Sequence, residues 1–134
     1  MTNGEVLKLY NALENISANK DLKFNFQIGY ALAKNREILR NEVKIISELR
    51  TKIFSEYGEA NDKGDIIIPK EKIDLTGRKI EELMGMENPV EILMLSIDAF
   101  DSTDNQLNLD DMAGLSYMIY IPEYTSGPIE KQEQ

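Results

Sequence analysis

The segment from residue 27 to residue 57 constrains the fold of this chain most, because it runs for about thirty residues without a proline. Within it, apolar residues recur seven apart and fill the intervening three- and four-residue offsets: Ile28, Leu32, Leu39, Val43, Ile46, Leu49, Ile53 and Tyr57. Side chains at these spacings lie on one face of an α-helix. The spacing therefore predicts one long amphipathic helix that organises the rest of the chain.

Apolar residues seven apart are also typical of a coiled-coil seam. If they occupy the d positions of a heptad repeat, Arg36 and Arg50 fall at a positions, where they would cost stability in a simple dimer. We therefore expect this helix to pack on the chain's own elements, with self-association as the alternative. A chain of alternating charges four apart predicts a face exposed to solvent: Lys44, Glu48, Lys52 and Glu56.

The composition is that of a soluble globular protein. The chain has 134 residues, of which 42% are hydrophobic and 29% charged, which suits one domain with one core. We expect this domain to cover residues 1–124 and residues 125–134 to form a flexible tail. No apolar run approaches the roughly 18 to 20 residues that a membrane span needs, and the N-terminus lacks the features of a secretory signal.

Cysteine and histidine are both absent from the sequence. Their absence excludes disulfides, thiolate nucleophiles, zinc sites of the usual sulfur and imidazole kind, and serine or cysteine nucleophiles activated by histidine. The remaining chemistry is that of carboxylates, of lysine, or of a magnesium or calcium site built from oxygen atoms.

Two sequence signals bound the first two helices. Thr2 and Glu5 have the spacing of a capping box, and an apolar stripe at helical period follows, which predicts a first helix to about Ala18. The long helix should end near Gly58, which we expect to be a left-handed cap.

Between these helices, Leu22, Phe24 and Phe26 alternate with polar residues. This alternation predicts a short half-buried strand whose phenylalanines face the core. Helix and strand are hard to separate in so short a run, and the alternative is a long helix that begins as early as Asn25, with the phenylalanines at its entrance.

The second half of the chain predicts two strands and two helices. Residues 65–69 hold three consecutive isoleucines and should be extended, and residues 70–84 should form a helix that breaks near Thr76 if the following glycine weakens it. Residues 90–97 form a short apolar run typical of a buried strand. Residues 108–120 should form a last helix with an asparagine cap.

Together these elements predict an α+β fold. One long amphipathic helix should pack with shorter helices on a small two- to three-stranded sheet, which we expect to form from the segments near Phe24, Ile67 and Leu93.

The net charge of −9 arises entirely in the C-terminal part of the chain. Residues 1–84 carry fourteen acidic and fourteen basic side chains, whereas residues 85–134 carry ten acidic side chains and only Lys131 as a base. Binding to a phosphate backbone requires clustered lysine and arginine, and this acidic segment would repel it. Direct binding to nucleic acid is therefore not expected.

The acidic residues form two clusters, and neither predicts a metal or catalytic site. The first lies between Asp98 and Asp111, but a calcium loop starting at Asp101 would have Gln106 where glycine is needed and Met112 in place of the closing glutamate. The second, within residues 81–91, lacks a nucleophile or glycine-rich loop nearby and is interpreted as an exposed helix face. We therefore predict no enzymatic activity, no cofactor and no metal.

The last predicted helix is a candidate partner-binding surface. It is rich in methionine and tyrosine, which are enriched where proteins meet, although a core helix has the same composition. The residues predicted to bind a partner are Asp110, Asp111, Leu115, Tyr117, Met118 and Tyr120.

Several short motifs carry a resemblance to a known family: Asn3-Gly4-Glu5, Leu9-Tyr10-Asn11-Ala12-Leu13, Tyr30-Ala31-Leu32-Ala33-Lys34-Asn35 and Tyr57-Gly58-Glu59 with Asp62 and Gly64. With them, most of the chain resembles a family of small proteins encoded by tailed bacteriophages and prophages. The closing segment, with acidic residues ahead of an apolar turn, is similar too. The family has no assigned activity, so the resemblance implies a phage or prophage context and no particular chemistry.

The function expected from the sequence is that of a non-enzymatic phage accessory protein acting through protein contacts. Its partner would be another protein or a second copy in an oligomeric or virion-associated assembly, in the cytoplasm of a bacterial host or in the virion, with no membrane involved. The alternative is an inhibitor of host defence whose acidic C-terminal third occupies the nucleic-acid-binding surface of a host protein.

Overall fold

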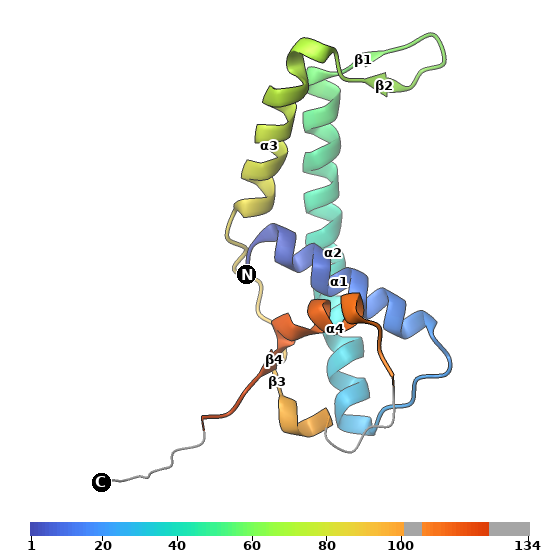
Figure 1. The fold of residues 1–134 in the computed structure, drawn as a ribbon, viewed down its shortest axis with the longest axis vertical. Coiled ribbons are helices and arrows are strands. Elements are labelled where there is room, and N and C mark those ends of the chain that lie inside the picture. Colours follow the sequence, from blue (N-terminus) through green and yellow to red (C-terminus); the bar gives the residue numbers. More distant parts are fainter. Residues whose placement is uncertain (101–105, 124–134) are drawn as a thin grey trace, which may run out of the picture.

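One helix runs the length of the molecule, and the other helices are arranged along it (Figure 1). The computed structural model describes residues 1–100 and 106–123. The long helix, α2, spans Phe26–Tyr57 and has 32 residues. Helix α1 (Asn3–Ala18) crosses α2 and packs against α4 (Leu109–Leu115), while α3 (Ile73–Gly85) lies beside the second half of α2. The predicted long amphipathic helix is confirmed.

The fold is α+β, as predicted, but its strands form two separate sheets. Strands β1 (Glu59–Ala60) and β2 (Ile66–Ile67) pair antiparallel in a hairpin beyond the end of α2. Strands β3 (Leu95–Ser96) and β4 (Ile119–Tyr120) pair in parallel. Three short 3-10 helices complete the described chain: η1 (Lys70–Lys72), η2 (Ile97–Phe100) and η3 (Ser116–Met118).

Helix α1 begins with the predicted capping box. The hydroxyl oxygen of Thr2 accepts a hydrogen bond from the backbone N–H of Glu5 at 3.2 Å, and a carboxylate oxygen of Glu5 accepts one from the Thr2 N–H at 2.8 Å. These two bonds satisfy backbone donors that a helix start leaves free. The helix ends at Ala18, also as predicted.

The strand predicted around Phe24 does not form, and the alternative start of the long helix is the correct one. The side-chain oxygen of Asn25 accepts a hydrogen bond from the N–H of Ile28 at 2.9 Å, so Asn25 caps α2 and helical geometry begins at Phe26. A capped helix start leaves no room for a strand of useful length. Phe24 is half-buried against the core, whereas Phe26 is 89% exposed, contrary to the prediction for that side chain.

Only two residues of the strand predicted at residues 90–97 are in a strand. The backbone of Leu93 does not pair with a strand. Its N–H and its carbonyl both form hydrogen bonds with the side-chain amide of Asn35 on α2. The Leu93 N–H donates to Asn35 Oδ1, and Asn35 Nδ2 donates to the Leu93 carbonyl, each at 2.8 Å. Asn35 is fully buried, so this pairing fixes the segment to α2 in the core.

The last helix is shorter than the predicted range of 108–120. Asn108 caps it as expected, accepting a hydrogen bond from the N–H of Asp111 at 2.8 Å, but α4 ends at Leu115. After the turn of η3, the chain becomes extended and pairs with β3. Residues 119–121 are Ile, Tyr and Ile, which favour a strand over a helix.

The predicted helix at residues 70–84 is present as η1 followed by α3, and it continues through Thr76. The Thr76 hydroxyl donates to the carbonyl of Lys72 at 2.7 Å, which holds the first turn together. The end of α2 differs from the prediction in one respect. Gly58 caps it with an extended backbone (φ −97°), and the left-handed glycine is Gly64 in the hairpin turn (φ +84°).

Most of the core lies where α1 and α4 pack beside the first half of α2. Its most deeply buried apolar side chains are Val6, Leu9, Leu13, Ile28, Leu39, Leu115 and Met118. The face of α2 predicted to be apolar supplies much of this core, while its predicted charged face is exposed. Helices α1 and α4 approach closely at Gly114, where an added Cβ would lie 2.6 Å from the Cβ of Ala12.

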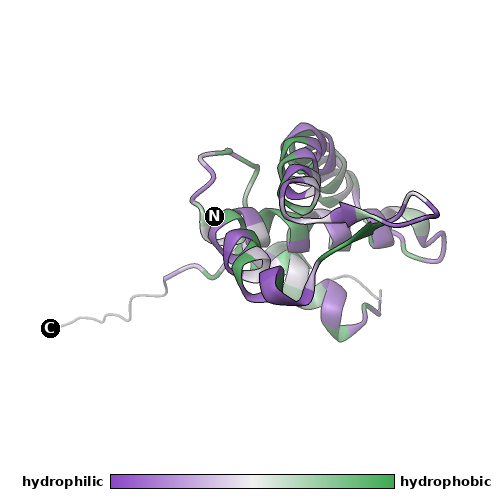
Figure 2. Cartoon of the chain, turned by 90° about the horizontal axis from the view of Figure 1, so that it is seen from above, coloured by the Kyte–Doolittle hydropathy of each residue, from purple (hydrophilic) through white to green (hydrophobic). Residues whose placement is uncertain are grey.

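The second half of α2 and the neighbouring α3 form a thinner part of the molecule, here called the α2–α3 arm (residues 43–85). Within this arm Ile46, Thr76 and Leu83 are buried, whereas Ile45, Leu49 and Ile73 are among its exposed apolar residues. The hairpin projects to one side of it (Figure 2), and both isoleucines of strand β2 are exposed.

The N-terminus is joined to the segment after α3 through buried amides. Asn88 Nδ2 lies 2.9 Å from Asn3 Oδ1 and 3.1 Å from a carboxylate oxygen of Glu42 on α2. Asn3 Nδ2 in turn donates to the Leu83 carbonyl at 2.8 Å. These bonds tie α1, α2 and α3 together at one point.

Over residues 1–100 and 106–123, no helix is both long and apolar enough to cross a membrane. The tail predicted at residues 125–134 lies outside the described residues.

An apolar groove as candidate functional site

The C-terminal third of the chain forms an open apolar groove of about 500 Å³, called the C-terminal groove below. It is lined by Ile97, Phe100, Leu107, Met112, Leu115, Ser116, Ile119 and Ile121. Seven of these eight residues are apolar. A continuous apolar hollow of this kind is typical of a surface that contacts another protein or a ligand.

Three elements position the lining. The turn η2 supplies Ile97 and Phe100, helix α4 supplies Met112 and Leu115, and β4 with the residue after it supplies the isoleucines. The parallel pairing of Leu95 with Ile119 brings the η2 side and the β4 side together. The groove therefore depends on the contact between β3 and β4, two segments far apart in the sequence.

The floor of the groove is anchored in the core. The side chain of Leu115 is almost completely buried and forms this floor. Ser116, the polar residue of the lining, is exposed, and its hydroxyl donates to the carbonyl of Ala113 at 2.6 Å. The apolar floor suits apolar side chains better than polar ones.

The rim of the groove is exposed. Met112 is 51% exposed and Ile121 is 72% exposed, while Ile97 is also exposed. Because these side chains lie in water, covering them with a partner would stabilise a complex.

The structure divides the predicted partner-binding residues between the core and the surface. Leu115 and Met118 are buried by this chain's own helices. Asp111 is also buried, and its Oδ1 accepts a hydrogen bond from Asn15 Nδ2 at 3.2 Å, which joins α4 to α1. These side chains support the groove from behind. Asp110 is exposed in the first turn of α4.

Of the two predicted tyrosines, Tyr120 is exposed on β4 and Tyr117 is half-buried against the core. Sequence reasoning did not select Ile97, Phe100 or Leu107 as site residues. Their apolar character was visible, but they join the other lining residues only through the pairing of β3 with β4.

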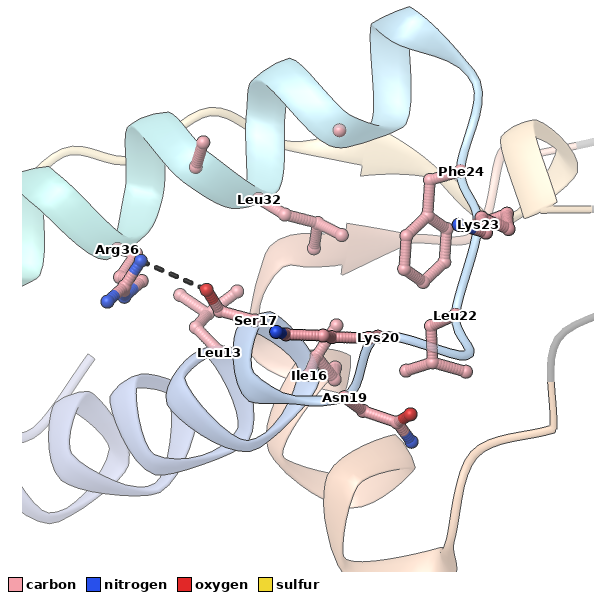
Figure 3. A pocket seen from close by; sticks show the side chains of 12 residues that line it. Leu13, Ile16, Ser17, Asn19, Lys20, Leu22, Lys23, Phe24, Leu32 and Arg36 are labelled. Atoms are coloured by element: carbon pink, nitrogen blue, oxygen red, sulfur yellow. Dashed lines mark hydrogen bonds between the residues drawn. The ribbon is translucent and has the colours of Figure 1, made fainter.

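A second hollow of about 500 Å³ lies between the end of α1 and the start of α2 (Figure 3). Leu13, Leu22, Phe24 and Leu32 line its apolar side, and Arg36 approaches from α2. The Arg36 guanidinium forms an ion pair with Glu14 and donates to the Ser17 hydroxyl at 3.0 Å.

The contact between Ser17 and Arg36 does not activate the serine. The Ser17 oxygen accepts from a guanidinium, which has no capacity to take up a proton, so this contact does not activate the serine as a nucleophile. The pKa of Arg40, on the next turn of α2, is raised by a hydrogen bond with Tyr10 and by the charge of Glu37. A raised pKa keeps this side chain cationic and unsuited to proton transfer near neutral pH.

The described residues contain no group of three or more acidic side chains placed to hold a metal ion. The calcium loop considered at Asp101 lies partly outside the described residues.

No protein-family model matches this chain, and no curated protein and no solved structure is significantly similar to it.

Proposed function

We propose that this is a non-enzymatic accessory protein that acts through protein–protein contacts. The observation that supports the proposal is the C-terminal groove, an apolar hollow whose rim is exposed. Large exposed apolar surfaces on a folded chain are rare unless they bind something. We propose further that this contact function belongs to a phage or prophage protein, in the host cytoplasm or in the virion, as part of an oligomeric or virion-associated assembly; the sequence resemblance supports this context.

Light scattering at micromolar concentrations tests the assembly. The proposal predicts a particle mass above the 15.3 kDa of a single chain, and a mass that rises with concentration. A second measurement locates the contact. Met112→Glu, at the rim of the groove, should lower the mass, whereas Met86→Glu should not.

These two substitutions form a matched pair. Met86 is 56% exposed and lies outside the groove, so both variants add one charge to a methionine of similar exposure. A strict monomer at every concentration would count against assembly, and an equal effect of both variants would place the contact elsewhere.

The second candidate is an acidic inhibitor of a host defence protein or another nucleic-acid-binding protein. It is favoured by the charge distribution, because residues 85–134 carry ten acidic side chains and one basic one. Such a segment repels nucleic acid and attracts the basic surface of a protein that binds it. In this reading too, the protein makes no direct contact with nucleic acid.

Salt dependence separates the second candidate from the first. An inhibitor that imitates phosphate charge should compete with DNA for a nucleic-acid-binding protein, with an affinity that falls steeply between low and high salt. Asp110→Asn should weaken this competition, while Asp62→Asn, in the hairpin turn, should not. Competition that is unchanged by salt would contradict charge imitation.

A further inference from the structure

We propose that the C-terminal groove takes up a basic amphipathic segment of another protein, with apolar side chains in the groove and lysine or arginine outside it. This inference rests on the proposed contact function and names the chemistry of the partner. It is carried by the apolar lining of the groove together with the charge of the segments that form it.

The lining of the groove favours an apolar ligand. The buried Leu115 forms an apolar floor, seven of the eight lining residues are apolar, and Met112 is exposed at the rim. Methionine is unbranched and flexible, and it adapts to side chains of different shapes. The groove therefore favours a ligand with several apolar side chains, such as one face of an amphipathic helix.

The segments that form the groove, residues 97–100 and 107–123, are acidic. They carry three exposed acidic residues, Asp98, Asp110 and Glu123, together with the buried Asp111, and neither lysine nor arginine. Charges act over about 8 Å at physiological salt, which is within reach of a ligand seated among these segments. A partner with basic residues beside its apolar face would be attracted, and an acidic one repelled.

The same charges disfavour a second copy seated groove to groove, so in a self-assembly the groove of one copy would contact a different surface of the next copy. In a two-fold contact each patch faces itself, so the acidic segments of both copies would lie close together. A basic segment of a different protein avoids this repulsion.

Binding of a designed probe tests the inference on the full chain. The probe is a fluorescent helical peptide of leucine and lysine with leucines at three- and four-residue spacing, and the comparison peptide has glutamate in place of lysine. Fluorescence anisotropy should show binding of the lysine peptide and at least about tenfold weaker binding of the glutamate peptide.

The matched methionine variants separate groove binding from general attraction to an acidic protein. Met112→Glu should lower the affinity for the lysine peptide by about tenfold, because it places a carboxylate against the apolar face of the peptide. Met86→Glu adds the same charge elsewhere and should leave the affinity within about twofold. Circular dichroism shows whether each variant is folded.

The charge contribution is tested by a second matched pair. The double variant Asp110→Asn, Glu123→Gln should lower the affinity for the lysine peptide several-fold, and this loss of affinity should be smaller at high salt. Glu59→Gln with Asp62→Asn removes the same charge from the hairpin beyond α2 and should have little effect.

Equal weakening by both methionine variants, or equal binding of both peptides, would overturn the inference. The proposed contact function has a separate readout. If the lysine peptide does not bind but self-association depends on Met112, the basic partner is excluded and the contact function stands. If the chain is a monomer and binds neither peptide, both proposals fail.

Discussion

Asn35 pairs with the backbone of Leu93 through two hydrogen bonds of 2.8 Å each, in the way that one strand pairs with another. The second hydrogen of the Asn35 amide points to the sulfur of Met118, at 3.4 Å. One buried side chain thus joins α2 to the segment before β3 and to the turn before β4. It fixes the two segments that form the C-terminal groove.

Asn35→Ala should lower the free energy of unfolding by about 2 to 3 kcal/mol, because two part-buried hydrogen bonds to the Leu93 backbone are lost and the fully buried amide leaves a cavity. Urea denaturation followed by circular dichroism measures the change. Asn41→Ala, at an exposed position of the same helix, should change it by less than about 0.5 kcal/mol. Similar losses in both variants would show that the pairing contributes little.

Gly114→Ala should destabilise the protein by about 1 to 3 kcal/mol, because the added methyl group overpacks the contact between α4 and α1. Its carbon would lie 2.6 Å from the Ala12 Cβ and 2.8 Å from the carbonyl oxygen of Lys8. Gly77→Ala, in α3, meets no atom within 4 Å and should stabilise by about 0.5 to 1 kcal/mol. Thermal melting of both variants distinguishes these opposite signs.

Thr2→Ala should cost about 1 kcal/mol, because it removes the acceptor of the Glu5 N–H at the start of α1. Thr51→Ala, at an exposed position within α2, lacks a capping role and serves as the control. Denaturant midpoints compare the two. A loss confined to Thr2→Ala is the expected result, and equal midpoints would remove the capping box as a source of stability.

Gly58→Ala should loosen the hairpin while leaving the core intact. The added carbon would lie 2.4 Å from Ile66 Cγ2 and 2.6 Å from the Phe54 carbonyl oxygen, so β2 has to move away. Hydrogen exchange at the Asn61 amide, which donates to the Asp65 carbonyl at 2.8 Å, should become faster. Exchange at the Leu39 amide, in the core region of α2, should stay slow.

Local signals predicted the helices well. The seven-residue repeat placed Leu32, Leu39 and Ile46 in the core, and the Thr2 and Glu5 spacing marked the start of α1 correctly. These features depend on residues within one or two helical turns of each other, so the sequence carries them directly.

The errors arose where a distant partner decides the local structure. Leu93 sits in an apolar run that favours a strand, but its backbone pairs with Asn35, 58 positions away. Residues 119–120 were assigned to the end of the last helix and instead pair with β3. Propensity within a short window carries no information about either partner.

The candidate site was predicted only in part for the same reason. An apolar C-terminal segment was evident from the sequence, and it does supply Met112 and the isoleucines of the groove. Which of its residues are buried, as Leu115 and Met118 are, depends on how α1 packs behind them. Ile97 and Phe100 line the groove because β3 pairs with β4, and no local pattern in the sequence indicates this pairing.

The two halves of helix α2 lie in different environments. The first half packs against the core, whereas the second half packs mainly against α3 and has few buried side chains. Amide protons near Tyr57 should therefore exchange through local opening, while those near Leu39 should exchange only through global unfolding. Local opening of the arm should therefore leave the C-terminal groove intact, because its lining comes from other elements.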